Sequence, residues 1–330
     1  MKKELNNILF INTGGGIGDA LSSLAIINYI NSNFSVKNFY YFSNDFEYFW
    51  FENKLQEYKP KNLITIKNFP IGYGFEFKHR KVSKKLIDLF NFDQFDLIID
   101  NQTRVNNSLV FKKIPHKYFV SPCINFLLSK PFYFTKKNNN LTLRIINYFN
   151  KILNKNISPK YNIKIPEDYL SKSRELMPNN SKYIGFSITA GHPTRKKEFQ
   201  LDEIIKVANY FKKRNYIPVF FIEKKYTELK SLLREKIDNV FFPEEKVNEK
   251  FQNPMIVTAL GSLTEYNITI DNGISHMLSF SNNKNYIFYN ESSDKFKPAS
   301  DKSVIFDCKL NNTTINSLKS DQIIEFIINN

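Results

Sequence analysis

Cysteine and long apolar runs are what this sequence most lacks. It has two cysteines, Cys123 and Cys308, and their wide separation fits neither a zinc site nor a disulfide framework. No apolar run approaches the ~20 residues that a membrane-spanning helix requires. The charged start, MKKELNN, is followed by too few apolar residues to form a secretory signal peptide. These absences favour a cytoplasmic protein in a reducing compartment.

Glycine is also scarce, with 10 residues in a chain of 330, but several glycines stand together in one turn. They are Gly14, Gly15, Gly16 and Gly18. An apolar run at residues 8–11 predicts a buried strand before the turn, and an amphipathic segment of helix length follows it. Such a turn presents backbone N–H groups and the positive end of a helix to an anion. Glycine also lets the backbone approach a ligand closely, which favours a functional loop.

The residue that follows this glycine turn, Asp19, argues against a phosphate site. The dinucleotide-binding fingerprint requires its third glycine here, and a carboxylate would repel a bound pyrophosphate. A Walker A loop is excluded too, because no Gly-Lys-Ser/Thr follows. Two interpretations of Asp19 remain, which are a general base at the mouth of a cleft and an ordinary cap of the first helical turn.

The chain has 330 residues, of which 42% are hydrophobic, and this size and composition suit two α/β domains or one large one. The formal net charge is +15. Three explanations of this charge remain open: free use of lysine, attraction to an anionic membrane or lipid acceptor, and nucleic-acid binding. The last is the weakest because the sequence has no zinc pattern or RNA-recognition motif, so we expect no nucleic-acid partner.

The first half has an alternating α/β pattern. It predicts strands at residues 38–42, 62–66 and 95–100 and helices at 82–90 and 141–153. The strand at 95–100 is apolar on both faces, as in a parallel sheet, and it ends in the polar residues Asp100, Asn101 and Gln102. Ligands bind at such carboxyl ends. A basic patch follows at Lys112, Lys113, His116 and Lys117. Residues 154–166 lack periodicity and predict a domain junction.

The second half repeats the α/β pattern. It predicts strands at residues 183–188, 217–222, 240–242, 266–270 and 286–289. Helices are predicted at 201–214, 226–236, 254–260 and 273–280, with an amphipathic helix at 314–328. Two successive runs of this kind predict two doubly wound domains that face each other across a cleft.

Two polar stretches of the second half follow predicted strands. The first runs from Ser187 through Thr189 to Gly191 and continues into the basic residues His192, Arg195, Lys196 and Lys197. It suits a diphosphate cradle, although a solvated charged turn would have the same composition.

The second stretch is Asp271-Asn272-Gly273-Ile274-Ser275-His276, where a buried strand gives way to a helix. The first N–H groups of that helix can bind an anion. A lone histidine is usually structural, but His276 stands in a dense polar cluster. The loop at 290–294 would border the same cleft.

Together these residues resemble glycosyltransferase family 9, which includes the ADP-heptose:lipopolysaccharide heptosyltransferases. Gly18-Asp19 match the family's first loop, and residues 96–102 match in part its strand ending like DLVIDLQG. Thr189, Gly191 and Lys197 match its small-residue loop, with Phe199 in place of Trp. Asp271, Gly273 and His276 match its Asp-Ser/Thr-Gly-x-x-His motif, with Asn272 at the hydroxyl position. Tyr289-Asn290-Glu291-Ser292 stands where the family usually has Phe-Gly-Pro-Thr.

The resemblance implies a GT-B fold with two Rossmann-like domains. Residues 1–160 would bind the acceptor, 161–312 would bind the nucleotide sugar, and the helix in 313–330 would return to the first domain. No metal and no cofactor are implied, and the sequence has no Asp-x-Asp motif. Asp19 would be the catalytic base, with Gly18, Asp100, Gln102 and Arg104 on the acceptor side. The donor would be held by Thr189, Gly191, Lys197, Asp271, Asn272, Gly273 and His276.

Three functions compete at this point. The first is an inverting transfer of a sugar from a nucleoside diphosphate sugar, with ADP-heptose as a candidate, to a lipopolysaccharide-core or similar glycolipid. Such an enzyme would work at the cytoplasmic face of an anionic inner membrane. The second is a non-catalytic nucleotide-sugar-binding relative, which the departures at Asn272 and Asn290 keep open. The third is an NAD-dependent oxidoreductase that uses the turn at Gly14, although its third glycine is missing.

Overall fold

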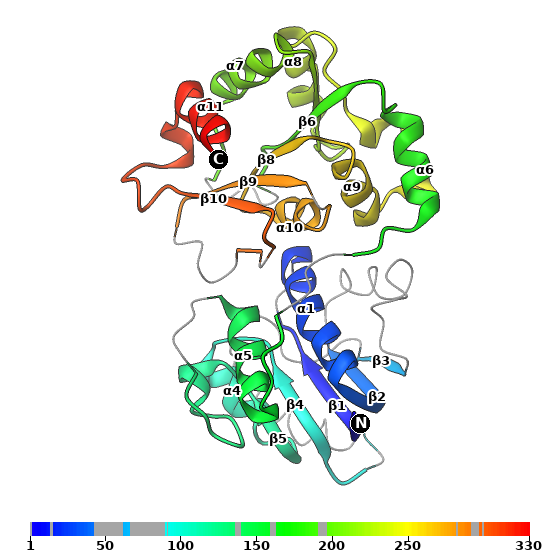
Figure 1. Ribbon diagram of the computed structural model, residues 1–330, viewed down its shortest axis with the longest axis vertical. Coiled ribbons are helices and arrows are strands. Elements are labelled where there is room, and N and C mark those ends of the chain that lie inside the picture. Colours follow the sequence, from blue (N-terminus) through cyan, green and yellow to red (C-terminus); the bar gives the residue numbers. More distant parts are fainter. Residues whose placement is uncertain are drawn as a thin grey trace. The chain divides into compact units, whose positions relative to one another are not determined.

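The computed structural model describes most of the chain. The described residues are 2–13, 16–42, 62–66, 90, 92–135, 140–158, 163–190, 197–281, 283–291, 297–298 and 300–330. The chain forms two compact units, Met1–Lys160 and Tyr161–Asn330 (Figure 1). Within the described ranges, no helix is both long and apolar enough to cross a membrane. The helix predicted over 82–90 falls almost wholly outside these ranges.

Unit 1 is built on a parallel five-stranded sheet with the order β3-β2-β1-β4-β5. The strands are β1 (Lys3–Ile11), β2 (Phe34–Phe42), β3 (Leu63–Ile66), β4 (Phe95–Asp100) and β5 (His116–Val120). The helices are α1 (Ile17–Asn33), α4 (Val105–Phe111) and α5 (Leu141–Leu153), with the 3-10 turn η2 (Cys123–Phe126). The strand order reverses between β1 and β4. In a doubly wound sheet this switch point is where ligands bind, outside the carboxyl ends of the strands.

The core of unit 1 explains why β1 and β4 lie at its centre. Residues 8–11 and 97–100 are buried on both faces of the sheet, and the ring of Phe10 stacks on Tyr41 with 5.4 Å between centroids. A strand that is apolar on both faces is stable only with helices on both sides. The basic patch predicted around His116 is partly a strand, because His116 and Lys117 begin β5 at the edge of the sheet.

Unit 2 has a second parallel five-stranded sheet, with the order β10-β9-β8-β6-β7. The strands are β6 (Lys182–Ser187), β7 (Tyr216–Phe220), β8 (Tyr266–Ile270), β9 (Lys284–Tyr289) and β10 (Ser303–Asp307). The helices are α6 (Glu167–Leu176), α7 (Leu201–Lys212), α8 (Thr227–Lys236), α9 (Pro254–Gly261), α10 (Gly273–Ser279) and α11 (Ser320–Asn329). The strand predicted at 240–242 is reduced to one parallel bridge between Phe241 and Val219. The order reverses between β6 and β8, so this is the second switch point.

The two faces of the second sheet differ in chemistry. One face is apolar and packs against residues of α7, α8 and α11. The other carries buried polar side chains. It is covered by α10, and α9 packs against α10 (Figure 1). On this face a Cβ at residue 185 would lie 2.2 Å from Asn267 Oδ1, which explains why Gly185 is glycine.

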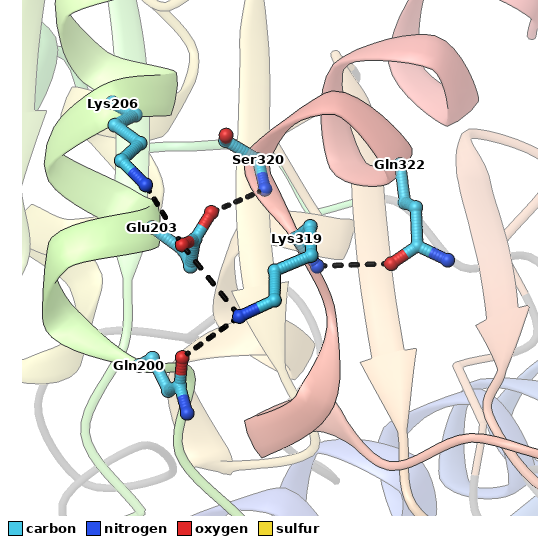
Figure 2. A network of polar contacts seen from close by, with 6 residues as sticks. All are labelled: Gln200, Glu203, Lys206, Lys319, Ser320 and Gln322. Atoms are coloured by element: carbon cyan, nitrogen blue, oxygen red, sulfur yellow. Dashed lines mark hydrogen bonds and ion pairs between the residues drawn. The ribbon is translucent and has the colours of Figure 1, made fainter.

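The C-terminal segment is a short turn followed by a helix, where the sequence predicts one continuous helix. A 3-10 turn, η6 (Ile315–Ser317), precedes α11, and Ile323 and Ile327 of α11 belong to the core of unit 2. The backbone N–H of Ser320 donates to Glu203 Oε2 at 2.7 Å, as Figure 2 shows. Glu203 also pairs with Lys206 of its own helix, with 2.9 Å between Nζ and Oε1. The apolar stripe predicted in this tail therefore packs on the sheet of its own unit.

Candidate functional site

The second-unit candidates gather where β6 and β8 end side by side. Asn272 caps α10 and joins the two strand ends. Its Nδ2 donates to Ser187 Oγ at 2.9 Å and to the backbone oxygen of Thr189 at 3.0 Å. Its Oδ1 accepts from the backbone N–H of Ser275 at 2.9 Å. One amide side chain therefore fixes both loops at the switch point.

Beside Asn272, Lys197 and Asp271 form an ion pair between the segment before α7 and the end of β8. Their side chains are 24% and 23% exposed, so both reach solvent at this edge of the sheet. The backbone N–H of Ala190 donates to Glu198 Oε1 at 2.9 Å, which ties the start of this loop to its end. The predicted donor residue Gly191, with the basic residues up to Lys196, lies outside the described ranges.

His276 lies in α10 and is 6% exposed. Burial lowers the pKa of its imidazole to about 4, although the charge of Asp271 acts in the opposite direction. The ring is therefore neutral at pH 7 and brings no positive charge to a diphosphate. The predicted role of His276 in donor binding would therefore rest on a neutral imidazole.

Buried hydrogen bonds hold α10 against its sheet. Asn285 of β9 donates through Nδ2 to the backbone oxygen of Ser275 at 2.8 Å and to Ser279 Oγ at 2.9 Å. Thr269 of β8 donates to Asn285 Oδ1 at 3.1 Å. A satisfied buried network of this kind fixes a helix more specifically than apolar packing alone. The start of α10, with Asn272 and Gly273, is therefore held at a set position on the sheet.

Asn290 follows β9 and contacts the C-terminal segment. Its Oδ1 accepts from the backbone N–H of Ile315 at 2.6 Å. The amide therefore holds η6 at the end of β9. The rest of the predicted 290–294 loop, beyond Glu291, lies outside the described ranges.

In unit 1, Asp19 is the third residue of α1 and is half-buried. Its Oδ2 accepts from the backbone N–H of Gly16 at 3.3 Å, and its backbone oxygen accepts from Asn12 Nδ2 at 3.1 Å. The contact with Gly16 is a helix cap of the kind that one of the two interpretations of Asp19 predicts. The same contact places a negative charge where a dinucleotide site would hold pyrophosphate, which disfavours the oxidoreductase hypothesis.

Gln102 lies beside Thr13, at the switch point between β1 and β4. Thr13 Oγ1 donates to Gln102 Oε1 at 2.9 Å, and Asn107 Nδ2 lies 3.4 Å from the same oxygen. The backbone N–H of Asn101 donates to the oxygen of Ile11 at 2.9 Å, so β1 and β4 end in register. Gly18, in the first turn of α1, belongs to the same edge, and Arg104 is exposed at the start of α4.

Asp100 is placed differently from the other acceptor-side candidates, because its carboxyl group is fully buried. Ser108 and Ser121 both donate their hydroxyls to its Oδ2. Burial raises the pKa of this carboxyl to about 7, against the lowering effect of the hydrogen bonds from Ser108, Ser121 and Gln102. Asp100 therefore connects β4, α4 and the end of β5 beneath the site rather than facing an acceptor.

One site contact comes from a residue that the motifs do not single out. Glu198 directly follows Lys197, and it accepts from the backbone N–H of Ala190 across the loop. No local pattern marks Glu198, because its partner stands eight residues earlier in the chain. Among the described residues, no group of three or more His, Cys, Asp and Glu side chains could hold a metal ion.

Comparison with known proteins gives matches only at the level of structure. No family model and no curated protein sequence matches the chain. A glycosyl transferase family 9 structure from Veillonella parvula matches with a TM-score of 0.69 and 16% identity, over 100% of this chain and 98% of the other. Escherichia coli ADP-heptose lps heptosyltransferase II matches with a TM-score of 0.63 and 15% identity, over 98% of this chain and 97% of the other. Escherichia coli heptosyltransferase WaaC with ADP-2-deoxy-2-fluoro heptose matches with a TM-score of 0.67 and 13% identity, over 98% of this chain and 99% of the other.

These matches establish the fold class. The chain is an α/β protein of the GT-B type with two Rossmann-like domains, as the motifs predict. The resemblance to family 9 is confirmed in three dimensions, over nearly the full length of each protein.

Proposed function

We propose that the protein is an inverting, metal-independent glycosyltransferase that moves a hexose or heptose from a nucleoside diphosphate sugar to a glycolipid. ADP-heptose is the first candidate donor, and a lipopolysaccharide core or similar surface glycan is the candidate acceptor. The observation that carries the proposal is the bridge from Asn272 to Ser187 and Thr189 at the second switch point. In a sheet of this order, that edge is where a nucleotide binds.

The donor would lie on residues 161–312, with its diphosphate near Lys197 and the start of α10. Lys197 is a cation at the correct edge, and Thr189 and Gly273 bring backbone groups there. These groups would stabilise the negative charge that develops on the departing diphosphate. No cofactor takes part, because the nucleotide sugar is the substrate.

The acceptor would lie on residues 1–160, with Asp19 as the general base and Gly18, Gln102 and Arg104 around it. Asp19 would remove the proton of the acceptor hydroxyl, whose oxygen attacks the anomeric carbon. The bond from that carbon to the diphosphate breaks on the opposite face, and its electron pair leaves with the diphosphate. Alignment of the two substrates would supply much of the rate enhancement. Asp100 would act only by positioning these elements.

The enzyme would work in the cytoplasm, in peripheral contact with an anionic membrane that holds its acceptor. A non-catalytic nucleotide-sugar-binding protein is the alternative function. It is favoured by Asn272, since an amide stands where family 9 has a hydroxyl. Turnover distinguishes the two functions.

A thermal-unfolding screen with ADP-, GDP-, UDP- and CDP-sugars tests the donor proposal. A donor at a hundred times its Kd should stabilise the native protein by about 2.7 kcal/mol, whereas NADH should have no effect. Lys197→Ala should reduce the shift, and Lys182→Ala, which changes a lysine 60% exposed at the opposite end of β6, should retain it. Absence of a shift with every sugar nucleotide would contradict the proposal. Binding with no transfer or hydrolysis would support the non-catalytic alternative.

A further inference from the structure

The net charge of the chain is concentrated in unit 1. Residues 1–160 contain 23 Lys and Arg but only 11 Asp and Glu, which gives a net charge of +12. Residues 161–330 contain 24 Lys and Arg and 21 Asp and Glu, which gives a net charge of +3. Basic residues are therefore spread evenly, and acidic residues are depleted from the first unit. The depletion is complete in residues 101–160, which hold 11 Lys and Arg and no Asp or Glu. Free use of lysine does not explain this loss of acids.

The same segment carries most of the exposed apolar side chains. Of twelve large hydrophobic residues exposed in the described part of the chain, eight lie between residues 101 and 160. They are Val105, Leu109, Ile124, Leu127, Phe132, Tyr133, Phe134 and Ile157. Single exposed hydrophobic residues are ordinary, but a concentration of them marks a surface that docks on another body.

Five of these residues belong to one ordered segment after β5, residues 124–134. Backbone hydrogen bonds join Phe119 and Lys130 in both directions, and Thr135 Oγ1 donates to Asn125 Oδ1 at 3.3 Å. Inside the segment, the buried ring of Phe126 stacks on Tyr148 of α5, with 4.6 Å between centroids. The base of the segment is therefore fixed to the core of unit 1.

Other side chains of this segment remain exposed to solvent. Ile124, Leu127 and Phe134 are 53%, 51% and 61% exposed. The basic residue Lys151 of α5 donates to the backbone oxygen of Phe134 at 3.0 Å, and its Nζ lies 5.4 Å from the centre of the Tyr133 ring. Lys130, within the segment, is exposed as well. One lysine therefore lies within the apolar segment, and a second lysine, from α5, lies beside it.

The backbone of this segment is strained. Ile124, Asn125 and Phe126 have φ values of 45°, 51° and 69°, in the left-handed region. A β-branched residue such as isoleucine is disfavoured there, and such strain persists where the surroundings impose it and commonly marks functional segments. Ile124 gains little packing in return, because about half of its surface stays in solvent.

We propose that Ile124, Leu127, Phe132, Tyr133 and Phe134 form a docking surface for an anionic lipid bilayer. The apolar side chains would enter the boundary between head groups and acyl chains, and the surrounding lysines would pair with lipid phosphates. The proposal deepens the proposed function, since a glycolipid acceptor would hold unit 1 at the membrane. Vesicle binding requires no sugar transfer, however, so it can fail or succeed independently.

Charge and side-chain type favour lipid over other partners. A second copy of the chain would bring one strongly basic unit against another, which like charges oppose. Nucleic acid would use the lysines and the aromatic rings, but it has no apolar layer to receive Ile124 and Leu127. A bilayer with anionic head groups satisfies both the charge and the aliphatic side chains.

Co-sedimentation of the full chain with phosphatidylcholine vesicles, with and without phosphatidylglycerol, tests the proposal. The double variant Leu127→Ser with Phe134→Ser should bind the anionic vesicles at least about tenfold more weakly than the unmodified protein. The matched variant Leu232→Ser with Leu310→Ser changes exposed apolar residues of unit 2 and should bind within twofold of the unmodified protein. Binding should weaken as salt shortens the Debye length from about 8 Å at 0.15 M to about 3 Å at 1 M.

Equal binding by the two double variants would overturn the proposal. Equal binding to vesicles with and without phosphatidylglycerol would overturn its electrostatic part. The unmodified protein could instead self-associate without binding vesicles. If Leu127→Ser with Phe134→Ser abolished that self-association, the surface would belong to a contact with a second copy of the chain. The variant Leu127→Ser with Phe134→Ser should unfold at the same temperature as the unmodified protein. In that case its loss of binding does not result from a loss of folding.

Discussion

Asn272 Nδ2 lies 2.9 Å from Ser187 Oγ, so a side chain at the end of β8 holds the end of β6. The two residues are 85 positions apart in the chain, but their strands are neighbours at the point where the sheet order reverses. The same amide caps α10 through Ser275. A side chain with both donor and acceptor atoms is required for this arrangement, which gives a physical reason for Asn at this position.

Replacement of Asn272 by serine should separate these two roles. Serine can still cap α10, but it cannot span the distance to Ser187 and the oxygen of Thr189, so donor affinity should fall by about tenfold with little loss of stability. Asn272→Ala should lose the cap as well, at a further cost of about 1 kcal/mol in unfolding free energy. Calorimetric titration with the donor and urea unfolding measure the two effects.

The control for this prediction is Asn253→Ser. Asn253 caps α9 through Met255 and donates to Tyr169 Oη at 2.6 Å, so it is also a capping asparagine with a second contact. Its replacement should leave donor affinity unchanged. Equal donor affinity in Asn272→Ser and Asn253→Ser would refute the bridging role.

The sequence predicts the centre of each sheet well because those strands are apolar on both faces. The strands at 95–100 and 266–270 and the helix at 141–153 have the predicted bounds. The missed elements lie at edges or have weak local signals. Asn106, Asn107 and Ser108 are poor helix formers within α4, and β5 and β10 are edge strands with short or interrupted apolar patterns.

Strand ends also reveal where polar candidates gather, but not which way each side chain points. Asp271 follows β8 and reaches solvent, whereas Asp100 is the last residue of β4 and points into the core. Side chains alternate along a strand, so a shift of one residue exchanges surface for interior. The bridge from Asn272 to Ser187 depends on pairing between distant strands and cannot be read from local sequence.

Asp100 should make stability depend on pH. Burial raises the pKa of its carboxyl in the folded protein from the usual 3.8 to about 7, so its contribution to stability is fully present below pH ~4 and is lost as pH rises through 7. The expected loss is a few kcal/mol at most, measured by urea unfolding between pH 4 and 8.

The variant Asp100→Asn should remove that dependence, because its amide oxygen can still accept from Ser108 and Ser121. Asp96→Asn, which changes a partly exposed carboxylate on the same strand, should retain it. Identical pH profiles for Asp100→Asn and the unmodified protein would show that Asp100 is not the titrating group.

Glu203 should make a pH-dependent contribution of opposite sign. Hydrogen bonds from the Ser320 backbone and from Lys206 lower the pKa of its carboxyl from 4.5 to about 2. This contribution is therefore present above pH ~4.5 and is lost as pH falls through 2. Glu203→Gln should lower the thermal unfolding midpoint at pH 7, and its difference from the unmodified protein should shrink as pH falls towards 2.

A matched control for this prediction is Glu228→Gln. Glu228 lies in the first turn of α8, as Glu203 does in α7, but its side chain is exposed. Its replacement should leave the unfolding midpoint unchanged at pH 7. Glu203→Gln should also expose α11 to proteolysis, and equal cleavage of the two variants would contradict its role in holding the tail.

Transfer of sugar to acceptor by Asp19→Asn tests the central claim most directly. The asparagine oxygen can still accept from the Gly16 N–H, so the start of α1 should be kept while the base is lost. We predict a fall in turnover of about 10²–10⁴-fold, with the donor Kd unchanged. Asp168→Asn, at an exposed acid in the first turn of α6, should retain full turnover. Turnover by Asp19→Asn equal to that of Asp168→Asn would contradict the account.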